Sequence, residues 1–262
     1  MAAMTWADPS ANPVIGLAGG YPGLGGNFLH LGGDALRDLM RDGALPGSRE
    51  EVEQLAGELS RLHPKAVVPV PPGDCVIVEF NGSGGFGDPL ERDPERVARD
   101  VRDGKVSRES ALRHYGVALT DGGEVDAAAT EARRAAIRAE RLDGARAFRE
   151  ERLGPTEGAT VVLRGAGGSV DVVEHGGAHV WACSACGESL GPVTESFKLR
   201  APYRQRPPQE VDARLYPDPT QFSETRLLLR QYACPGCATL LAQEFCLADD
   251  EPWHDVRIEV PA

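Results

Sequence analysis

Residues 227–245 have the sequence LLLRQYACPGCATLLAQEF, and the cysteine pair at its centre decides how this part of the chain folds. A second pair lies in HVWACSACGESL, residues 179–190, again after strand-like residues. A C-x-x-C turn lets two thiolates converge on one ion, and two such turns complete a tetrahedral site. The spacing predicts a small β-rich, zinc-ribbon-like domain with one structural zinc ion. Its predicted ligands are Cys183, Cys186, Cys234 and Cys237.

Four thiolates would fill the coordination sphere of this zinc ion. No position would remain for water or substrate, so the sequence favours a structural role over a catalytic one. The alternative is two reduced or redox-active cysteine pairs, but a thioredoxin-like motif needs a βαβ context that the sequence lacks. Cys75 and Cys246 stand alone on apolar stretches, and we expect both to be buried as small hydrophobic side chains.

Composition limits the class of protein. The chain has 262 residues, a length that suits one large domain or two ordinary ones. Its formal net charge of −12 argues against a nucleic-acid binder. No apolar run approaches the ~20 residues that span a bilayer. The start, MAAMTWADPS, lacks the basic and apolar segments of a signal peptide. Paired cysteines favour metal binding in a reducing compartment, so we expect a cytoplasmic protein without a membrane partner.

A glycine run follows the strand-like segment 75–80. Residues Gly82–Gly87, GSGGFG, satisfy the pattern G-x-G-x-x-G. A dinucleotide fingerprint needs its helix to begin inside the glycine motif. The next good helix start is Asp93-Pro94, beyond the run. We therefore predict a turn that connects a strand to a helical arm, and no nucleotide site.

Periodicity and capping residues predict the remaining elements. Strands are expected at both sides of the proline-rich turn near residue 71, and a β-hairpin over 160–175. A capping box of Ser48 and Glu51 begins one expected helix. In the helix after Ser107, Leu112 and Tyr115 are expected to point inward. The expected helices are 34–41, 48–62, 93–104, 107–116 and a long, solvated one over 125–152.

No catalytic constellation can be defended, so no catalytic or cofactor-binding residue is predicted. Motifs for zinc proteases, serine hydrolases and P-loops are lacking. His254 could support a metal ligand or an interface, but an exposed loop histidine is the favoured interpretation. A basic run could contact a phosphate, although a solvated loop is favoured. The run comprises Lys198, Arg200, Tyr203, Arg204 and Arg206.

The expected fold class is α+β. Residues 1–122 form a β-rich, glycine-containing region with a helical arm, 123–158 a long helix and linker, and 159–262 the zinc-binding domain.

Two resemblances cover most of the chain. Residues 14–145 resemble the C-terminal end of the hydantoinase B / oxoprolinase B family, through GLAGGYPG (16–23), the block from PPGDCVIVEF to HYGVAL (71–119) and GEVDAAATEARRAAIRAER (123–141). Residues 178–258 resemble the small zinc-binding gamma subunit of acetone carboxylase and its acetophenone carboxylase relatives. The matching motifs there are CSACG (183–187), LLLRQYACPGCATLL (227–241) and WHDV (253–256).

The resemblance implies a multi-subunit, biotin-independent, ATP-dependent carboxylase for a ketone-type substrate. In that family a hydantoinase A-like chain binds ATP and a hydantoinase B-like chain holds the catalytic metal. This sequence matches only the tail of the B-like chain, so only the four cysteines can be carried over. We expect a non-catalytic, zinc-binding structural subunit in a hetero-oligomer with A-like and B-like partner chains.

Two other functions stay open. The first is the same structural role in an ATP-dependent hydantoinase, oxoprolinase or lactamase, but the gamma-like domain favours the carboxylase. The second is a zinc-ribbon module that binds nucleic acid. The acidic charge argues against that function, because proteins that bind nucleic acid neutralise its phosphates with Lys and Arg side chains.

Overall fold

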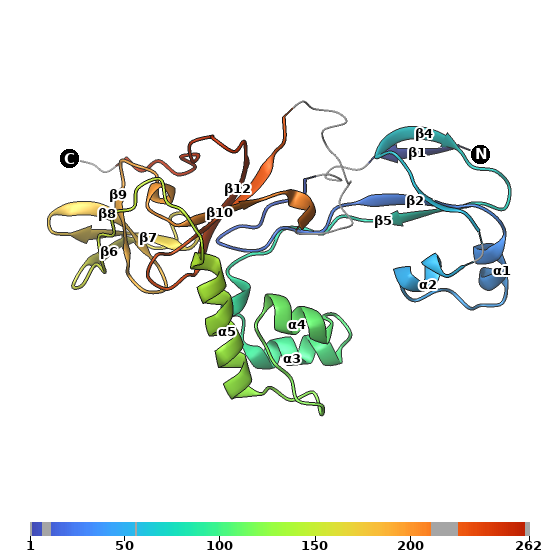
Figure 1. The fold of residues 1–262 in the computed structure, drawn as a ribbon, viewed down its shortest axis with the longest axis horizontal. Helices are drawn as coiled ribbons and strands as arrows, with labels where there is room; N and C mark the ends of the chain where they lie inside the picture. The colour runs from blue at the N-terminus through green and yellow to red at the C-terminus, as the bar shows by residue number, and fades with distance from the viewer. Residues whose placement is uncertain (1, 7–11, 56, 211–224, 260–262) are drawn as a thin grey trace. The chain divides into compact units, whose positions relative to one another are not determined.

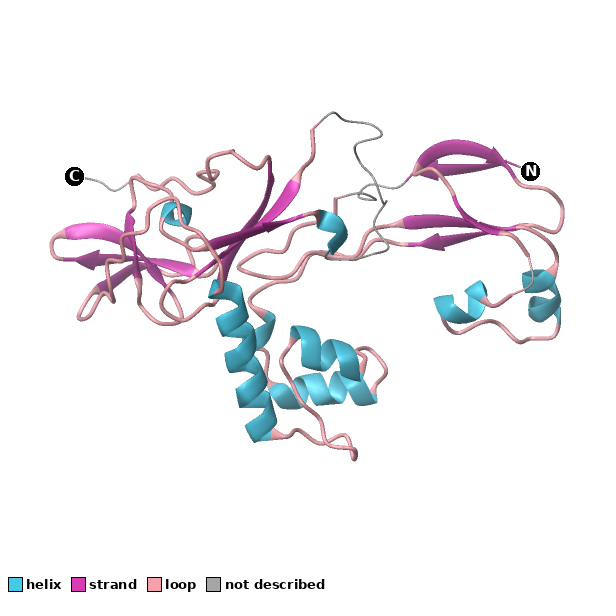
Figure 2. Ribbon diagram, in the orientation of Figure 1, coloured by secondary structure: helices cyan, strands magenta, loops and turns pink. Residues whose placement is uncertain are grey.

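The computed structural model describes residues 2–6, 12–55, 57–210 and 225–259. The chain forms two compact units. One unit comprises Met1–Val14, Gly23–Ser83 and Pro208–Glu224, and the other Ile15–Pro22, Gly84–Pro207 and Thr225–Ala262. Among the described residues strands outnumber helices (Figures 1 and 2), which confirms the α+β class. The limits 1–122, 123–158 and 159–262 stay a prediction.

The first unit contains two small sheets. Strand β1 (Ala2–Trp6) pairs antiparallel with β4 (Lys65–Pro69). In the second sheet, β2 (Asn27–Leu31) lies between β3 (Leu59–Arg61) and β5 (Cys75–Glu79), antiparallel to both. The strands predicted on both sides of the proline-rich turn are present, and the proline-bearing β4 lies in a two-stranded sheet where each strand is an edge, as proline requires.

The predicted helix over 48–62 is wrong in its length. Helix α2 spans only Arg49–Glu53, with Ser48 Oγ accepting from the Glu51 N–H. Gly57 has a φ of +140°, which no helix contains. The backbone of β3 instead satisfies its hydrogen bonds by pairing with β2, so sheet pairing outcompetes the helical pattern of this segment. The other predicted helix here is present as α1 (Ala35–Arg41).

The second unit begins its helical part with a 3₁₀ turn, η1 (Pro89–Glu91). The predicted caps are confirmed: Asp93 Oδ1 accepts from the Glu95 N–H, and Ser107 Oγ from the Ser110 N–H. These caps begin α3 and α4. The three helices of this part are α3 (Pro94–Arg102), α4 (Arg108–His114) and α5 (Ala127–Leu142).

A small apolar cluster joins α3 to α4. Val97, Ala111 and Val117 are buried in it, and Tyr115 packs against them as predicted. The prediction that Leu112 points inward is wrong, because this side chain is exposed. Residues 111 and 115 are one helical turn apart and share the buried face, whereas residue 112 lies about 100° further round.

Helix α5 is shorter than the predicted span of 125–152. It ends at Leu142, because Asp143 is extended and Gly144 has a φ of +63°. The following residues make hydrogen bonds elsewhere: the N–H and C=O of Arg146 both pair with Tyr203, and the Arg149 N–H donates to Leu199 O. The segment after α5 is therefore an extended strap.

Two antiparallel sheets complete the second unit. The first runs in chain order and includes the predicted hairpin; its strands are β6 (Thr160–Leu163), β7 (Val170–His175), β8 (Ala178–Cys183) and β9 (Ser189–Pro192). The second contains β10 (Tyr203–Arg206), β11 (Leu228–Ala233) and β12 (Leu240–Cys246). Two 3₁₀ turns are η2 (Phe197–Leu199) and, in the first unit, η3 (Pro208–Glu210). Trp181, Leu190, Phe197, Tyr232 and Leu241 are among the residues of one shared core.

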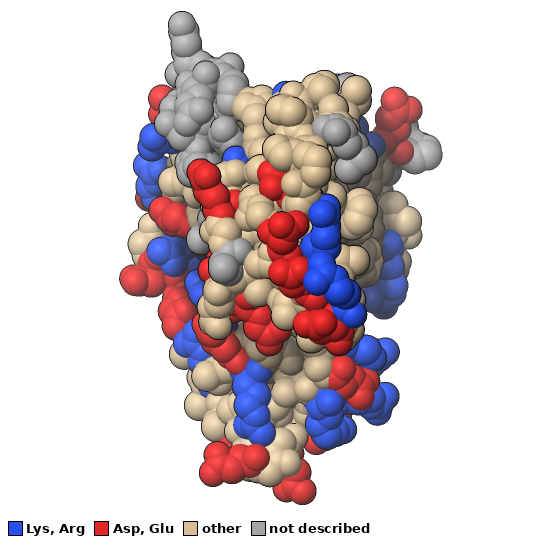
Figure 3. All heavy atoms as spheres, turned by 90° about the vertical axis from the view of Figure 1, so that its right-hand side faces the viewer, with Lys and Arg blue, Asp and Glu red and all other residues tan. Residues whose placement is uncertain are grey.

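On the face drawn in Figure 3, acidic and basic side chains are interspersed and no continuous basic surface forms. Within the described residues, no helix has the length and apolar character to cross a membrane.

Candidate metal centre

Two hairpin turns bring the four predicted cysteines together. One turn joins β8 to β9 and the other joins β11 to β12. The four Sγ atoms all lie within 4.8 Å of one another. Sγ of Cys183 is 3.8 Å from Sγ of Cys237, and Sγ of Cys186 is 3.6 Å from Sγ of Cys234. A tetrahedral ion with Zn–S bonds of about 2.3 Å requires S···S edges of about 3.8 Å, so this arrangement fits zinc.

The two turns have the same backbone conformation. Gly187 and Ala238 each follow the second cysteine of a pair, with φ of +74° and +57°. Their N–H groups donate to the carbonyls of Cys183 and Cys234 at 2.8 and 2.9 Å. The Gly236 N–H also points at Cys234 Sγ, 3.3 Å away. Glycine is the residue expected at such a position, whereas Ala238 adopts it against its own preference.

Without a cation, the crowded sulfurs do not all ionise readily: the pKa values of Cys183 and Cys234 are raised, while hydrogen bonds with these two cysteines lower the pKa of Cys237. The hydrogen bond with Cys234 lowers the pKa of Cys183, but the bond with Cys237 and burial outweigh it and raise that pKa to about 12. Hydrogen bonds with Cys183 and Cys237, together with burial, raise the pKa of Cys234 as well. A divalent cation would supply the positive charge that thiolates need here.

The cysteines have a hydroxyl and a buried carboxylate as neighbours. Thr239 Oγ1 lies 3.2 Å from Cys237 Sγ. The carboxylate of Glu188 is buried and accepts from Arg152 at 2.9 Å. Only Cys186 among the four is exposed. Within the described residues, this is the one group of Cys, His, Asp and Glu with the geometry of a metal site.

The remaining cysteines and His254 differ in how they meet expectation. Cys246 is buried as predicted, but Cys75 is only half-buried on β5. His254 lies in an irregular segment, yet its ring is half-buried instead of exposed, and Nε2 is buried without a hydrogen-bond partner.

The predicted solvated basic loop is wrong. Lys198 is fully buried in η2, where its Nζ pairs with Glu244 Oε2 at 2.8 Å and with Asp255 Oδ2 at 2.5 Å. Arg200 is nearly buried and pairs with Glu195 at 3.0 Å. The last residues of the run form β10, and of these Arg204 is exposed. The prolines of this segment indicated a loop, but Lys198 has acidic partners far away in sequence, and Arg200 pairs with Glu195 nearby.

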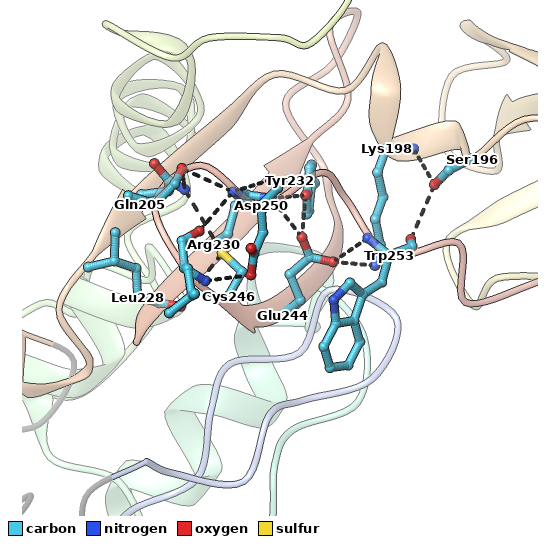
Figure 4. A network of polar contacts seen from close by, with 12 residues as sticks. Ser196, Lys198, Gln205, Leu228, Arg230, Tyr232, Glu244, Cys246, Asp250 and Trp253 are labelled. Atoms are coloured by element: carbon cyan, nitrogen blue, oxygen red, sulfur yellow. Dashed lines mark hydrogen bonds and ion pairs between the residues drawn. The ribbon is translucent and has the colours of Figure 1, made fainter. Parts of the chain in front are cut away.

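Sequence reasoning missed the buried network around Glu244 (Figure 4). Its Oε1 accepts from Arg230 Nη1 at 3.0 Å and from the Tyr232 hydroxyl at 2.5 Å. Burial, and then the hydrogen bond to Glu244, raise the pKa of Tyr232. Arg230 and Glu244 face each other across the β11–β12 hairpin. That pairing is the signal that could have revealed the network, because opposite charges on facing strand positions attract.

A second buried ion pair was also missed. Asp88 Oδ2 and Oδ1 lie 2.6 and 2.8 Å from the two terminal nitrogens of Arg141. Both side chains are buried. Asp88 comes directly after the glycine run, and Arg141 lies in the last turn of α5.

The glycine run is a turn paired with another backbone segment. The Gly85 N–H donates to Tyr21 O at 2.8 Å and the Gly87 N–H to Leu17 O at 3.0 Å. A Cβ on Gly20 would lie 2.1 Å from Gly85 O. These glycines permit the close approach of two backbones, and the paired amides have no hydrogen left to offer a phosphate.

Residues 166–262 match the family described as acetone carboxylase gamma subunit. The chain is 42% identical over 80 residues to caprolactamase subunit beta of Pseudomonas jessenii, covering 30% of this chain and 14% of that protein. It is 32% identical over 149 residues to the acetone carboxylase alpha subunit of Xanthobacter autotrophicus (strain ATCC BAA-1158 / Py2), covering 48% and 18%. A solved nucleotide-free acetone carboxylase is 29% identical, with a TM-score of 0.38, over 49% of this chain and 19% of that one.

Both resemblances stated from the sequence are confirmed: the C-terminal region matches the gamma family, and the relatives include hydantoinase B-type subunits and an acetone carboxylase alpha subunit. The chain spans less than a fifth of the length of each of these relatives.

Proposed function

We propose that this chain is a non-catalytic, zinc-binding structural subunit of a multi-subunit, biotin-independent, ATP-dependent carboxylase for a ketone-type substrate. The observation that carries the proposal is the four-sulfur cluster inside the residues that match the gamma subunit family. The likeness to an acetone carboxylase alpha subunit supports the same class of enzyme. Relatives named as subunits support a hetero-oligomer.

In this function the zinc ion would hold the two cysteine hairpins together. Cys183, Cys186, Cys234 and Cys237 are its ligands in the proposal, and the two hairpins share one apolar core. Since a structural zinc site is rarely formed in the unfolded chain, the free energy of binding becomes free energy of folding. ATP and a catalytic metal would bind to hydantoinase A-like and B-like partner chains.

A second function is favoured by one observation. Caprolactamase subunit beta carries the name of an enzyme that acts on a cyclic amide. It is 42% identical to this chain, whereas the acetone carboxylase alpha subunit is 32% identical. The same structural subunit could therefore serve an ATP-dependent hydrolase of cyclic amides.

Reconstitution separates the two functions. The chain is expressed with an affinity tag in its native host, and the complex that co-purifies is assayed for ATP hydrolysis. Hydrolysis that requires both bicarbonate and a ketone supports the carboxylase. Hydrolysis that requires a lactam or hydantoin and no bicarbonate supports the second function. A chain that purifies alone as a compact monomer contradicts both.

A further inference from the structure

The second cysteine turn is held from outside the two cysteine hairpins. Arg141 Nη1 donates to Ala238 O at 3.0 Å, and the Leu240 N–H donates to Asp88 Oδ2 at 3.1 Å. The Asp88–Arg141 ion pair therefore holds the carbonyl of Ala238, directly after Cys237, and the amide of Leu240, where β12 begins.

Both side chains of the Asp88–Arg141 ion pair are buried and make further hydrogen bonds. The side chain of Asp88 is 1% exposed and that of Arg141 is 9% exposed. Asp88 Oδ1 also accepts from the Leu90 N–H at 2.9 Å, and the Tyr21 hydroxyl lies 3.5 Å from Arg141 Nη2. Buried charges that lost these partners would be costly, so the ion pair and the turn stabilise each other.

The conformation of the turn explains why it needs such support. Ala238 has a φ of +57°, which an L-residue with a Cβ disfavours, and it directly follows the turn in which Cys234 and Cys237 must present two thiolates to one point. Groups that fix the backbone beside metal ligands orient those ligands and raise the affinity of the site. Here that group is a bidentate ion pair from the region that resembles hydantoinase B.

We propose that Asp88 and Arg141 are positioning residues of the metal site, and that metal binding in turn fixes the glycine turn and the end of α5. Coupling between binding and conformation is reciprocal. A change that loosens the ion pair weakens metal binding, and loss of metal loosens residues 84–91 and 138–146. This inference rests on zinc binding by the four cysteines, which belongs to the proposed function.

The first test measures zinc affinity by competition with a chromophoric chelator. Arg141→Lys keeps the charge but cannot bind both Asp88 oxygens and Ala238 O at once. Asp88→Asn keeps the shape and removes the charge. Both variants are expected to bind zinc about tenfold more weakly or worse. The matched control is Arg138→Lys on the same helix, whose pair with Glu91 is partly exposed; the zinc affinity of this variant should change by less than about twofold.

The second test needs no variant and so does not depend on mutant folding. Amide hydrogen exchange of the full chain is compared with and without a zinc chelator under reducing conditions. Exchange in 84–91 and 138–146 is expected to rise, while α3 and α4, with their own apolar cluster, keep their protection.

The outcomes are distinguishable from failure of the proposed function. No zinc in the wild-type protein contradicts the metal site itself. Zinc bound equally well by wild type, Arg141→Lys and Asp88→Asn, with unchanged exchange in 84–91, leaves the site intact and overturns the inference.

Discussion

The two cysteine hairpins make the same turn but are stabilised by different interactions. In the β8–β9 hairpin the left-handed position is Gly187, and its carbonyl accepts from the N–H and hydroxyl of Thr156, both at 2.9 Å. In the β11–β12 hairpin the same position is Ala238, and its carbonyl accepts from the buried cation Arg141. The first hairpin buries the apolar Trp181 on β8, whereas the second buries the charged Arg230 on β11 and Glu244 on β12.

The comparison shows that both metal-binding turns are held from outside their hairpins, the first by the neutral donors of Thr156 and the second by a buried ion pair. The first turn has a glycine at its left-handed position and a neutral donor to its carbonyl, and both cost little to place. In the second turn Ala238 adopts a left-handed conformation that alanine disfavours, and the buried ion pair of Asp88 and Arg141 compensates for this.

The largest effect is expected from removing a ligand. Cys234→Ser is expected to lose the metal and unfold both hairpins, because structural zinc supplies on the order of 10 kcal/mol of folding free energy. Zinc content and the fluorescence of buried Trp181 measure both outcomes. Cys75→Ser, outside the cluster and half-buried, is the control and should retain full zinc content.

The next largest effect is expected from removing the buried carboxylate of Glu244, which lies on β12 in the second hairpin. Glu244→Gln leaves Lys198 and Arg230 buried without their common carboxylate, and should lower the free energy of unfolding by about 3–5 kcal/mol. Urea titration of the zinc-loaded protein measures it. The matched control is Glu140→Gln on α5, whose exposed carboxylate pairs with the half-buried Arg133; it should cost about 0–1 kcal/mol. Equal effects in the two variants would contradict a buried network.

A smaller effect distinguishes the two left-handed positions. Gly187→Ala introduces a Cβ where φ is +74°, and is expected to destabilise the protein by about 1–2 kcal/mol. A Cβ there would meet Thr156 Oγ1 only at 3.7 Å, so the penalty comes from the backbone. Ala238→Gly removes the same penalty and should change stability by less than about 1 kcal/mol in either direction. Thermal unfolding of both variants checks the contrast, which a large loss in Ala238→Gly would refute.

The smallest effect is expected at the neutral donor. Thr156→Val removes one of the two hydrogen bonds to Gly187 O and should lower the free energy of unfolding by about 0.5–1.5 kcal/mol. Zinc affinity should barely change, unlike in Arg141→Lys. A loss of affinity as large as that of Arg141→Lys would mean that both turns depend equally on their outside donors.

Local patterns were sufficient for much of the fold. The spacing of the cysteines and the glycine after Cys186 predicted that four sulfurs converge, and the caps Asp93 and Ser107 fixed the starts of two helices. The exclusion of a dinucleotide fingerprint at the glycine turn also rested on local order, since no helix begins inside it.

Long-range pairing was out of reach of the sequence. Lys198 was assigned to a solvated loop because its neighbours are prolines and cations, whereas Glu244 and Asp255, far along the chain, neutralise it. The segment after residue 53 had a helical pattern, but its residues 59–61 pair with β2 as the edge strand β3. Asp88 and Arg141 gave no local sign of meeting at all. In each case the partner that decides the structure is distant in sequence.

The central claim is that the four cysteines hold one structural zinc ion, and metal analysis with zinc X-ray absorption on the reduced, full-length chain tests it most directly. The account predicts one zinc per chain with four sulfur ligands at about 2.3 Å. Substoichiometric zinc, or a shell containing oxygen or nitrogen, would contradict it.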